Sequence, residues 1–348
     1  MSIFLRVIFV SLFLLPITAC AQTKEYKVSD HYDGKKFFNP TLKGKSKPSF
    51  MDALSLIREG REAWPENNEN RGTPRINESL GPNEVSITFV NHATFLIQFR
   101  GFNILTDPIW SKRASPFSWI GPNRVREPGV KIEDLPKIDL VIISHNHYDH
   151  LDVKTLKTLN DLSPFKVIVP LGDKSLIESI GIKDVHELDW WEEVRISEDI
   201  QITFTPTQHG SARGVFDRDK SLWGSFYIKN KSRSIYFGGD AGYSKYFKET
   251  RERLGAPEIA LLGIGAYNPR WFMKSIHMNP LEAVIAHKDL EAKLSIGMHY
   301  GTFQLSSEGI DEPLKDLEKA LIRENVSSDD FVTLHEGETR IYGDLIND

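Results

Sequence analysis

One stretch of nine residues, 144–152, constrains this chain more than any other feature of its sequence. It reads Ser-His-Asn-His-Tyr-Asp-His-Leu-Asp, so three imidazoles and two carboxylates are crowded together. An apolar run of strand character precedes it over 138–143, and helical spacing of apolar residues begins at 151. Neutral imidazole nitrogens and carboxylate oxygens suit a borderline cation such as zinc. The stretch therefore predicts a metal site where a buried strand ends.

Within this stretch, His145 and His147 are two residues apart, so in an extended segment they face the same way and can share one ion. Asp149 and His150 come as the chain turns into the helix, where they can point at a second ion. A solvated polar loop with incidental histidines is the alternative. It is disfavoured because residues of the same ligand types follow later strand-like runs.

Three such residues recur along the chain. His209 follows a predicted strand and is assigned as the third imidazole of the first ion. Asp240 follows another strand and two glycines, and its two oxygens can bridge both ions, although an aspartate there can also cap a helix. His299 ends a further apolar run and completes the second ion. The sequence thus predicts two zinc ions, and iron or manganese would fit the same ligands.

The pattern His-x-His-x-Asp-His, together with Tyr148, Leu151 and Asp152, resembles the metallo-β-lactamase superfamily. Within it, the resemblance narrows to the N-acylphosphatidylethanolamine-hydrolysing phospholipase D group and covers most of residues 80–305. It implies an α/β fold, a four-layer αββα sandwich with the ligands on one edge. Periodicity alone predicts only mixed α and β structure.

The resemblance also implies roles for residues around the ligands. Asp107 is expected to brace the metal-binding loop by hydrogen bonding rather than to bind metal. Tyr148 and His277 match positions that contact substrate, so Tyr148 can donate to a phosphate oxygen and His277 can orient the substrate or protonate the leaving alkoxide. With Asp149, they are the candidate catalytic residues. His92 is expected to be a buried structural histidine.

The implied activity is that of a metal-dependent phosphodiester hydrolase of phospholipase D type. It would cleave the headgroup-side phosphodiester of N-acylphosphatidylethanolamine and release phosphatidic acid and an N-acylethanolamine. Water activated between two metal ions serves such a reaction without a serine or cysteine nucleophile. Two alternatives stay open: a related metallo-hydrolase of a soluble phosphodiester or lactone, and a non-catalytic metal-binding lipoprotein.

The first 20 residues read as a targeting segment. A nearly continuous apolar run follows Arg6 and leads through small residues to Cys20, as in a bacterial lipoprotein signal peptide whose cysteine is lipidated. An uncleaved transmembrane anchor is the alternative, but the run is short for a span of about 20 residues. We therefore expect a membrane-anchored lipoprotein of the bacterial cell envelope, exposed outside the cytoplasm.

After this leader, residues 21–80 are predicted to form an N-terminal tether and extension, and residues 81–348 the hydrolase domain. Seven lysines within 21–48 indicate either contact with anionic lipid headgroups or a solvated linker. The net charge of -5 offers no support for nucleic-acid binding, and the single cysteine excludes an intrachain disulfide. The expected partner is a membrane phospholipid, and the oligomeric state is left open.

Apolar periodicity and turn residues predict the remaining elements. Strands are predicted over 85–90, 95–99, 102–106, 165–170, 184–190, 193–206, 222–228, 234–237 and 331–334, and helices over 50–63, 151–161, 173–180, 279–286 and 310–324. A tight turn is expected at Arg100-Gly101 and a helix start at Asn279-Pro280.

The other histidines and several aromatic residues receive less specific roles. His186 and His335 lack a motif and are taken as structural, whereas His287 is expected on a helix surface and His277 exposed at a helix entrance. The irregular loop 111–128 can face a membrane or cover the substrate. The apolar side chains that either approach acyl chains or belong to the core are Trp119, Ile120, Trp271, Phe272 and Met273.

Overall fold

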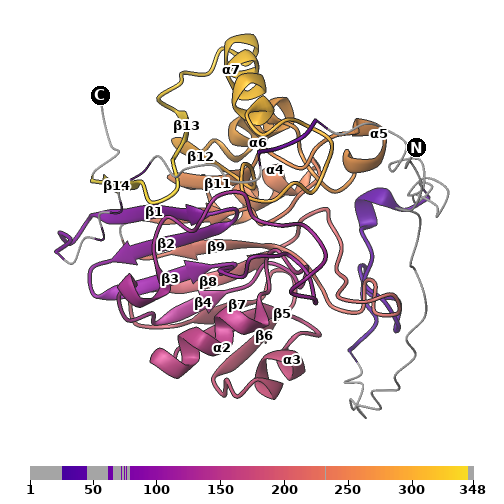
Figure 1. Cartoon of the computed structure of the whole chain (residues 1–348), viewed down its shortest axis with the longest axis vertical. Coiled ribbons are helices and arrows are strands. Elements are labelled where there is room, and N and C mark those ends of the chain that lie inside the picture. The colour runs from indigo at the N-terminus through magenta and orange to yellow at the C-terminus, as the bar shows by residue number, and fades with distance from the viewer. Residues whose placement is uncertain are drawn as a thin grey trace, which may run out of the picture.

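A computed structural model shows two β-sheets packed face to face, with helices covering the outer face of each sheet (Figure 1). The structure describes residues 26–44, 62–65, 72, 74, 76, 79–231 and 233–343. The layer order is helix, sheet, sheet, helix, which confirms the predicted αββα sandwich. Because both faces of each sheet are covered, the central strands are apolar nearly throughout rather than alternating.

The first sheet has seven strands. In spatial order they are β14 (Thr339–Tyr342), β1 (Val85–Asn91), β2 (Thr94–Phe99), β3 (Phe102–Thr106), β4 (Leu140–Ile142), β5 (Lys166–Pro170) and β6 (Val185–Leu188). Strands β1, β2 and β3 are antiparallel, and the predicted turn at Arg100-Gly101 joins the last two. Gly101 adopts a φ of +74°, which glycine reaches without steric cost. From β3 to β6 the strands run parallel.

The second sheet also has seven strands and repeats this plan. In spatial order they are β13 (Phe331–Thr333), β12 (Leu294–Met298), β11 (Ile259–Gly263), β10 (Ser234–Phe237), β9 (Ser225–Lys229), β8 (Gln201–Thr205) and β7 (Glu193–Arg195). Strands β7 to β10 are antiparallel, and β10 to β13 are parallel. The parallel strands of each sheet end at a common edge, where ligands usually bind in α/β proteins.

Helices cover the outer faces. Against the first sheet lie α2 (Val153–Leu162) and α3 (Lys174–Ser179), and against the second lie α4 (Tyr246–Leu254), α6 (Pro280–Leu290) and α7 (Glu312–Glu324). Three shorter elements are η1 (Pro40–Leu42), η2 (Ile132–Asp134) and α5 (Arg270–Met273). The expected start of α6 is confirmed, because Asn279 caps it and Glu282 completes a capping box.

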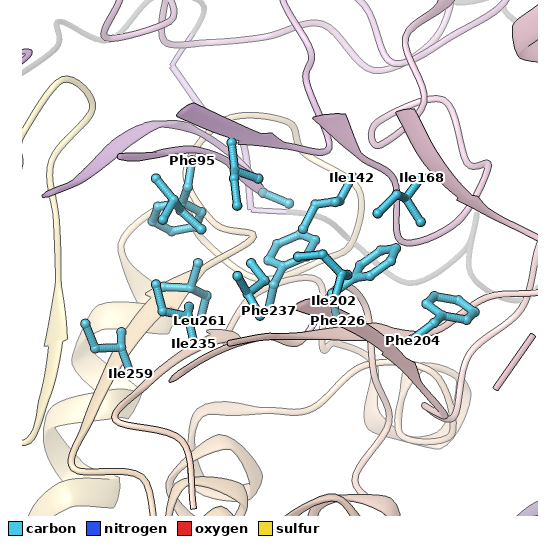
Figure 2. Packing of buried hydrophobic residues seen from close by; sticks show 14 of the residues in the cluster. Phe95, Ile142, Ile168, Ile202, Phe204, Phe226, Ile235, Phe237, Ile259 and Leu261 are labelled. Atoms are coloured by element: carbon cyan, nitrogen blue, oxygen red, sulfur yellow. The ribbon is translucent and has the colours of Figure 1, made fainter. Parts of the chain in front are cut away.

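The main apolar core lies between the sheets. Figure 2 shows Phe95, Ile142 and Ile168 from the first sheet facing side chains of the second, among them Phe226 and Phe237. All five are fully buried. Burying a side chain of this size stabilises the folded state by about 1.5–3 kcal/mol. This layer therefore fixes the two sheets relative to each other and, with them, the edge on which the ligands lie.

The strands differ from the prediction in two places. The strand expected over 193–206 is broken into β7 and β8 by a turn in which Ile196 donates its amide to the carbonyl of Ile200 at 2.9 Å. Strand β14 was not predicted. Only four residues long, it forms a partly exposed edge whose alternation is too short to detect.

The described part of the predicted tether, 26–44, is not a solvated linker. Tyr32 and Phe37 are buried in the core cluster between the sheets, and the Phe37 amide donates to the carbonyl of Asp219 at 2.8 Å. The buried His31 ring lies between two carboxylates, 2.7 Å from Asp30 and 2.7 Å from Asp189. The solvated-linker alternative was wrong because it rested on the lysines, which dominate the composition of the segment. The position of the segment is fixed instead by its buried aromatic residues.

Residues 1–20, including Cys20, lie outside the described residues, as do all but the last two residues of the helix predicted over 50–63. No helix in the described ranges is long and apolar enough to cross a membrane.

Candidate metal centre

The seven predicted metal ligands meet at the common edge of the two sheets. The first sheet contributes the loop after β4, and the second contributes the segments after β8, β10 and β12. Within the second sheet, β8, β10 and β12 run in the same direction, so their carboxyl ends lie at one edge. The side chains brought together are His145, His147, Asp149, His150, His209, Asp240 and His299.

The first ligand group consists of His145, His147, His209 and Asp240. Nδ1 of His147 lies 2.8 Å from Nε2 of His145 and 3.2 Å from Nε2 of His209. Oδ2 of Asp240 lies 3.8 Å from Nε2 of His145 and 3.6 Å from Nε2 of His209. Tetrahedral bonds of about 2.0–2.1 Å to zinc place the ligand atoms roughly 3.3 Å apart. The group therefore has the spacing that one zinc ion requires.

The second group consists of Asp149, His150 and His299, with Asp240 within reach. Oδ2 of Asp149 lies 3.3 Å from Nε2 of His150 and 3.4 Å from Nε2 of His299. Oδ2 of Asp240 lies 3.2 Å from Nε2 of His150, and its Oδ1 lies 3.2 Å from Nε2 of His299. Asp240 thus reaches both groups, which is the position that the sequence predicted for it.

Unpartnered polar atoms support the binding of cations here. Nε2 of His150, Nε2 of His299 and Oδ1 of Asp240 are buried and have no hydrogen-bond partner among the described residues. Leaving such atoms unsatisfied costs about 1–3 kcal/mol each. The three atoms belong to one ligand group, so a cation bound there would satisfy all of them at once.

The pKa shifts of the candidate ligands also favour the binding of cations. Burial alone would raise the pKa of Asp240, but the neighbouring imidazoles, His150 foremost, hold its pKa well below the usual range. Burial lowers the pKa of His209 to about 4, so this imidazole is neutral and free to act as a ligand at pH 7. Burial would also lower the pKa of His299, yet Asp240 and Asp149 raise it to about 9. The buried carboxylates are therefore ionised and need positive charge close by, which bound metal ions can supply.

A close approach of two loops brings the ligands together. Gly239 precedes Asp240 with a φ of +53°, and a Cβ atom on it would lie 2.6 Å from the Cβ of Ser144. A larger residue would therefore push the Asp240 segment away from the metal-binding loop. The glycine is needed here both for its backbone conformation and for its lack of a side chain.

Asp107 supports the metal-binding loop, as expected. Its Oδ2 lies 2.7 Å from Nδ1 of His150 and accepts a bond from the Ser144 hydroxyl at 2.6 Å, and its Oδ1 accepts from the Ser144 amide at 2.7 Å. The Ser144 hydroxyl also lies 2.9 Å from Nδ1 of His145. One buried aspartate thus orients ligands of both groups, an arrangement that tunes metal binding.

His92 is buried, as predicted, and its Nε2 lies 3.0 Å from Oδ2 of Asp149. Burial lowers the pKa of His92 to about 3, so the neutral ring donates to the ionised Asp149. His92, Asp107 and His299 have φ values of +47°, +33° and +62°. Such conformations are costly for residues other than glycine and cluster at functional sites.

Asn39 is a supporting residue that sequence reasoning missed. Its side-chain amide donates to the carbonyl of His209 at 2.7 Å, and its Oδ1 accepts from the His209 amide at 3.2 Å. Trp223 also donates to Asn39 Oδ1, at 3.3 Å. Nearby, the Thr41 hydroxyl donates to Gln208 at 2.7 Å. The segment expected to be a tether therefore holds the strand end that carries a metal ligand.

His277 lies at the metal centre but is not exposed, contrary to the expectation. Its side chain is 12% exposed, and its Nδ1 lies 3.9 Å from Oδ2 of Asp240. The cause is the short α5 turn, because the His277 amide bonds to the Met273 carbonyl at 2.8 Å and folds the segment back over the site. Its ring centre lies 5.1 Å from that of His209.

Tyr148 is bound to Arg213 in the structure. Its hydroxyl donates to the carbonyl of Arg213 at 2.8 Å, and the Arg213 guanidinium lies 4.1 Å from the centre of its ring. His287, expected at the surface, is buried instead, and its Nδ1 lies 2.9 Å from the Ser295 hydroxyl of β12. The helix face that carries His287 packs on the second sheet, and the spacing of apolar residues along the sequence did not reveal this. His186 lies outside the centre, 3.1 Å from Asp184.

Comparison with known proteins agrees with this site. Residues 102–300, more than half of the chain, match the family described as "Beta-lactamase superfamily domain". The chain is 41% identical to N-acyl-phosphatidylethanolamine-hydrolyzing phospholipase D 1 of Caenorhabditis elegans over 263 residues, which cover 72% of this chain and 74% of the relative. It is 40% identical to the mitochondrial N-acyl-phosphatidylethanolamine-hydrolyzing phospholipase D of Saccharomyces cerevisiae over 63% of this chain and 48% of that one.

A solved structure shares the fold. An isothiocyanate hydrolase from Delia radicum gut bacteria superposes with a TM-score of 0.61 over 74% of this chain and 99% of that one, at 21% identity. This likeness bears on the architecture alone, whereas the sequence relatives bear on the family. The chain is a metal-dependent hydrolase of the metallo-β-lactamase superfamily and belongs to its N-acylphosphatidylethanolamine-hydrolysing phospholipase D-like group.

Proposed function

We propose that this protein is a dinuclear zinc phosphodiesterase that cleaves N-acylphosphatidylethanolamine on the headgroup side and releases phosphatidic acid and an N-acylethanolamine. The observation that carries the substrate is the 41% identity to the C. elegans relative over 72% of the chain. Metal geometry alone would not select a lipid, because one fold hosts many reactions.

Two ions are proposed because the ligands divide into two groups around Asp240. The first group holds His145, His147 and His209, and the second holds Asp149, His150 and His299. Zinc suits a site built from imidazoles and carboxylates without cysteine, and iron or manganese would accept the same donors. When bound, such a pair of cations supplies Lewis acidity toward the phosphoryl group and lowers the pKa of a water molecule.

His277 is the side chain best placed to handle a proton. Burial lowers the pKa of His277 well below its ordinary value, so the ring is neutral at pH 7. It lies beside the ligands of both groups, with ring centres 5.1 Å from His209 and 5.2 Å from His299. A neutral imidazole there can orient a phosphoryl oxygen, or it can accept a proton from the attacking water and then, as imidazolium, give that proton to the departing alkoxide.

Tyr148 is proposed as a contact for the substrate headgroup. In the structure its hydroxyl bonds to the Arg213 carbonyl, so donation to a phosphate oxygen requires this bond to be exchanged. The conjugate acid of His277 and the Tyr148 hydroxyl would then serve different oxygens, on the leaving group and on the phosphoryl group.

The cellular location is proposed from the leader sequence. Lipidation at Cys20 would anchor the enzyme in a membrane of the bacterial cell envelope, outside the cytoplasm. Tethering raises the local concentration of enzyme at its lipid substrate, so the anchor and the proposed reaction suit each other.

Incubation of the purified protein with N-acylphosphatidylethanolamine vesicles, with and without chelator, tests the activity. We expect mass spectrometry to detect phosphatidic acid and N-acylethanolamine only in the sample that contains metal. Cleavage of a soluble phosphodiester without any turnover of the lipid would refute the substrate. Product formation that survives complete metal removal would refute the mechanism.

A further inference from the structure

A basic groove lies beside the metal-binding loop and contains none of the candidate metal ligands. It has a volume of about 560 Å³ and runs between the loop 111–118 and the start of α2. Tyr148 forms part of its wall. Its five basic lining residues are Lys112, Arg113, Lys154, Lys157 and Arg213. These five side chains give the groove the positive charge that an anion requires.

The positive charge of this groove is largely uncompensated. Asp152 is the acidic residue in its wall, and its carboxylate accepts bonds from the amides of Ser111 at 3.0 Å and Lys154 at 3.1 Å. Within the described ranges, Lys112, Lys154 and Lys157 form no ion pair, and all three are exposed. Their charges remain available to a ligand that approaches from solution.

Exposed apolar side chains flank the groove. Trp119 is 73% exposed, and its ring centre lies 5.6 Å from that of Phe117, which also lines the groove. Phe216 is 85% exposed and lies on the loop that carries Arg213. Large apolar side chains beside lysines are typical of surfaces that enter the headgroup region of a bilayer. The apolar side chains and the methylene chains of the lysines pack on lipid, while the ammonium groups contact phosphate.

We propose that this surface docks on an anionic bilayer and that the groove holds the phosphate of an anionic phospholipid other than the substrate. The lysines contact the lipid phosphate, and the apolar residues Phe117, Trp119 and Phe216 enter the interfacial region. The inference extends beyond the proposed function, because such docking requires neither bound metal nor turnover.

Arg213 connects the docking surface to the metal centre. Its guanidinium donates to the carbonyls of Asn146 at 2.9 Å and Leu151 at 2.8 Å, one near each end of the ligand-bearing loop. The same side chain lines the groove and packs on Tyr148. A bilayer docked at the groove would thus lie directly against the loop that carries His145 to His150.

A fluorescent probe beside Trp119 tests this docking. Cys20 is the single cysteine of the chain, so a full-length Cys20→Ser, Ser118→Cys protein carries one thiol for an environment-sensitive dye. With chelator present, we expect the dye emission to shift to shorter wavelength on vesicles that contain phosphatidylglycerol, but not on phosphatidylcholine alone. Raising the ionic strength should reverse the shift. Because the dye reports its own surroundings, binding through the N-terminal apolar run does not mimic this signal.

Charge reversal provides the decisive comparison. In the same labelled protein, Lys154→Glu with Lys157→Glu should raise the lipid concentration at half-maximal shift by roughly tenfold or more. Lys315→Glu with Lys319→Glu makes the same change of charge on α7, away from the groove, and should leave it unaltered. An equal shift on neutral vesicles, no shift on any vesicle, or equal behaviour of the two double variants would overturn the proposal. Each of these results is independent of whether the enzyme hydrolyses N-acylphosphatidylethanolamine.

Discussion

The side chain of Asn39 pairs with both backbone polar groups of His209, donating to the carbonyl at 2.7 Å and accepting from the amide at 3.2 Å. The two residues are 170 positions apart in the sequence. Through this pairing, the segment 26–44 fixes the backbone of a candidate metal ligand. The N-terminal segment is thus a structural part of the candidate metal centre.

Replacing Asn39 should weaken metal binding while the fold persists. Asn39→Ala removes both bonds to His209, and we expect the zinc affinity to fall by about tenfold, as for other residues that orient metal ligands. Competition with a chromogenic chelator measures this affinity, and circular dichroism reports the fold. Asn160→Ala on α2 is the matched control, with unchanged affinity. Unaltered zinc affinity in Asn39→Ala would mean that the core contacts of Phe37 are enough to hold the segment.

Loss of a ligand should abolish activity, whereas loss of a surface histidine should not. His299→Ala removes an imidazole that reaches both Asp149 and Asp240, so we expect lower metal content and no metal-dependent turnover. His186→Ala lies outside the centre and should keep nearly the full rate. Metal analysis of the purified variants, read beside the rate of product release, checks both expectations. A His299→Ala enzyme with normal turnover would exclude it as a ligand.

Neutralising Asp107 should act through the ligands that it orients. Asp107→Asn keeps the size of the side chain but weakens its contact with Nδ1 of His150, so we expect metal affinity to fall by about 10–100-fold. Excess zinc should then restore much of the activity, which it cannot do for a lost catalytic group. If added zinc has no effect on a slow Asp107→Asn enzyme, the residue has a role beyond positioning.

Stability should decline with rising pH because of His31. Burial alone would lower the pKa of His31, but hydrogen bonds to Asp189 and Asp30 raise it above the ordinary value. Protonated His31 therefore stabilises the folded state fully below its unfolded pKa of about 6.5, and this contribution is lost as the pH rises through the higher folded pKa. Asp30 is 87% exposed, so Asp189 should be the stronger partner.

Thermal melts from below pH 6.5 to alkaline pH test the contribution of His31 to stability. We expect the melting temperature of the wild type to fall toward alkaline pH more steeply than that of His31→Gln. Parallel curves for the two proteins would show that His31 is not the group responsible.

Removing the metal should destabilise the whole domain, because the ligands come from both sheets. At a free zinc concentration about 1,000 times the Kd, binding of one ion contributes about 4 kcal/mol to stability. For a domain of this size that corresponds to a fall in Tm of roughly ten degrees on chelation. Calorimetry with and without chelator measures it. An apo form that melts at the same temperature would mean that the centre binds metal weakly or not at all.

The sequence predicted that the candidate ligands converge, because each follows an apolar strand, and strands of one direction end at one edge. Asp240 and His299 could be assigned in this way although they are far from His145 in the chain. Asn39 could not, because no periodic pattern relates it to His209 and its segment reads as polar.

The errors on His277 and His287 have a common cause. Local spacing describes one helix or turn at a time, whereas exposure depends on what packs against it. The fold of α5 covers His277, and β12 covers His287. Likewise, the expected role of the loop 111–128 depended on whether its aromatic residues were buried, and only the structure shows that Phe117 and Trp119 are exposed.

Strand β14 has a consequence for biosynthesis. It pairs with β1, so the sheet that begins first along the chain is completed by residues 339–342. Until these residues leave the ribosome, β1 has an open edge on which another chain could assemble. The first sheet therefore cannot be completed before residues 339–342 are available, and a chaperone that shields β1 until then would protect it from aggregation.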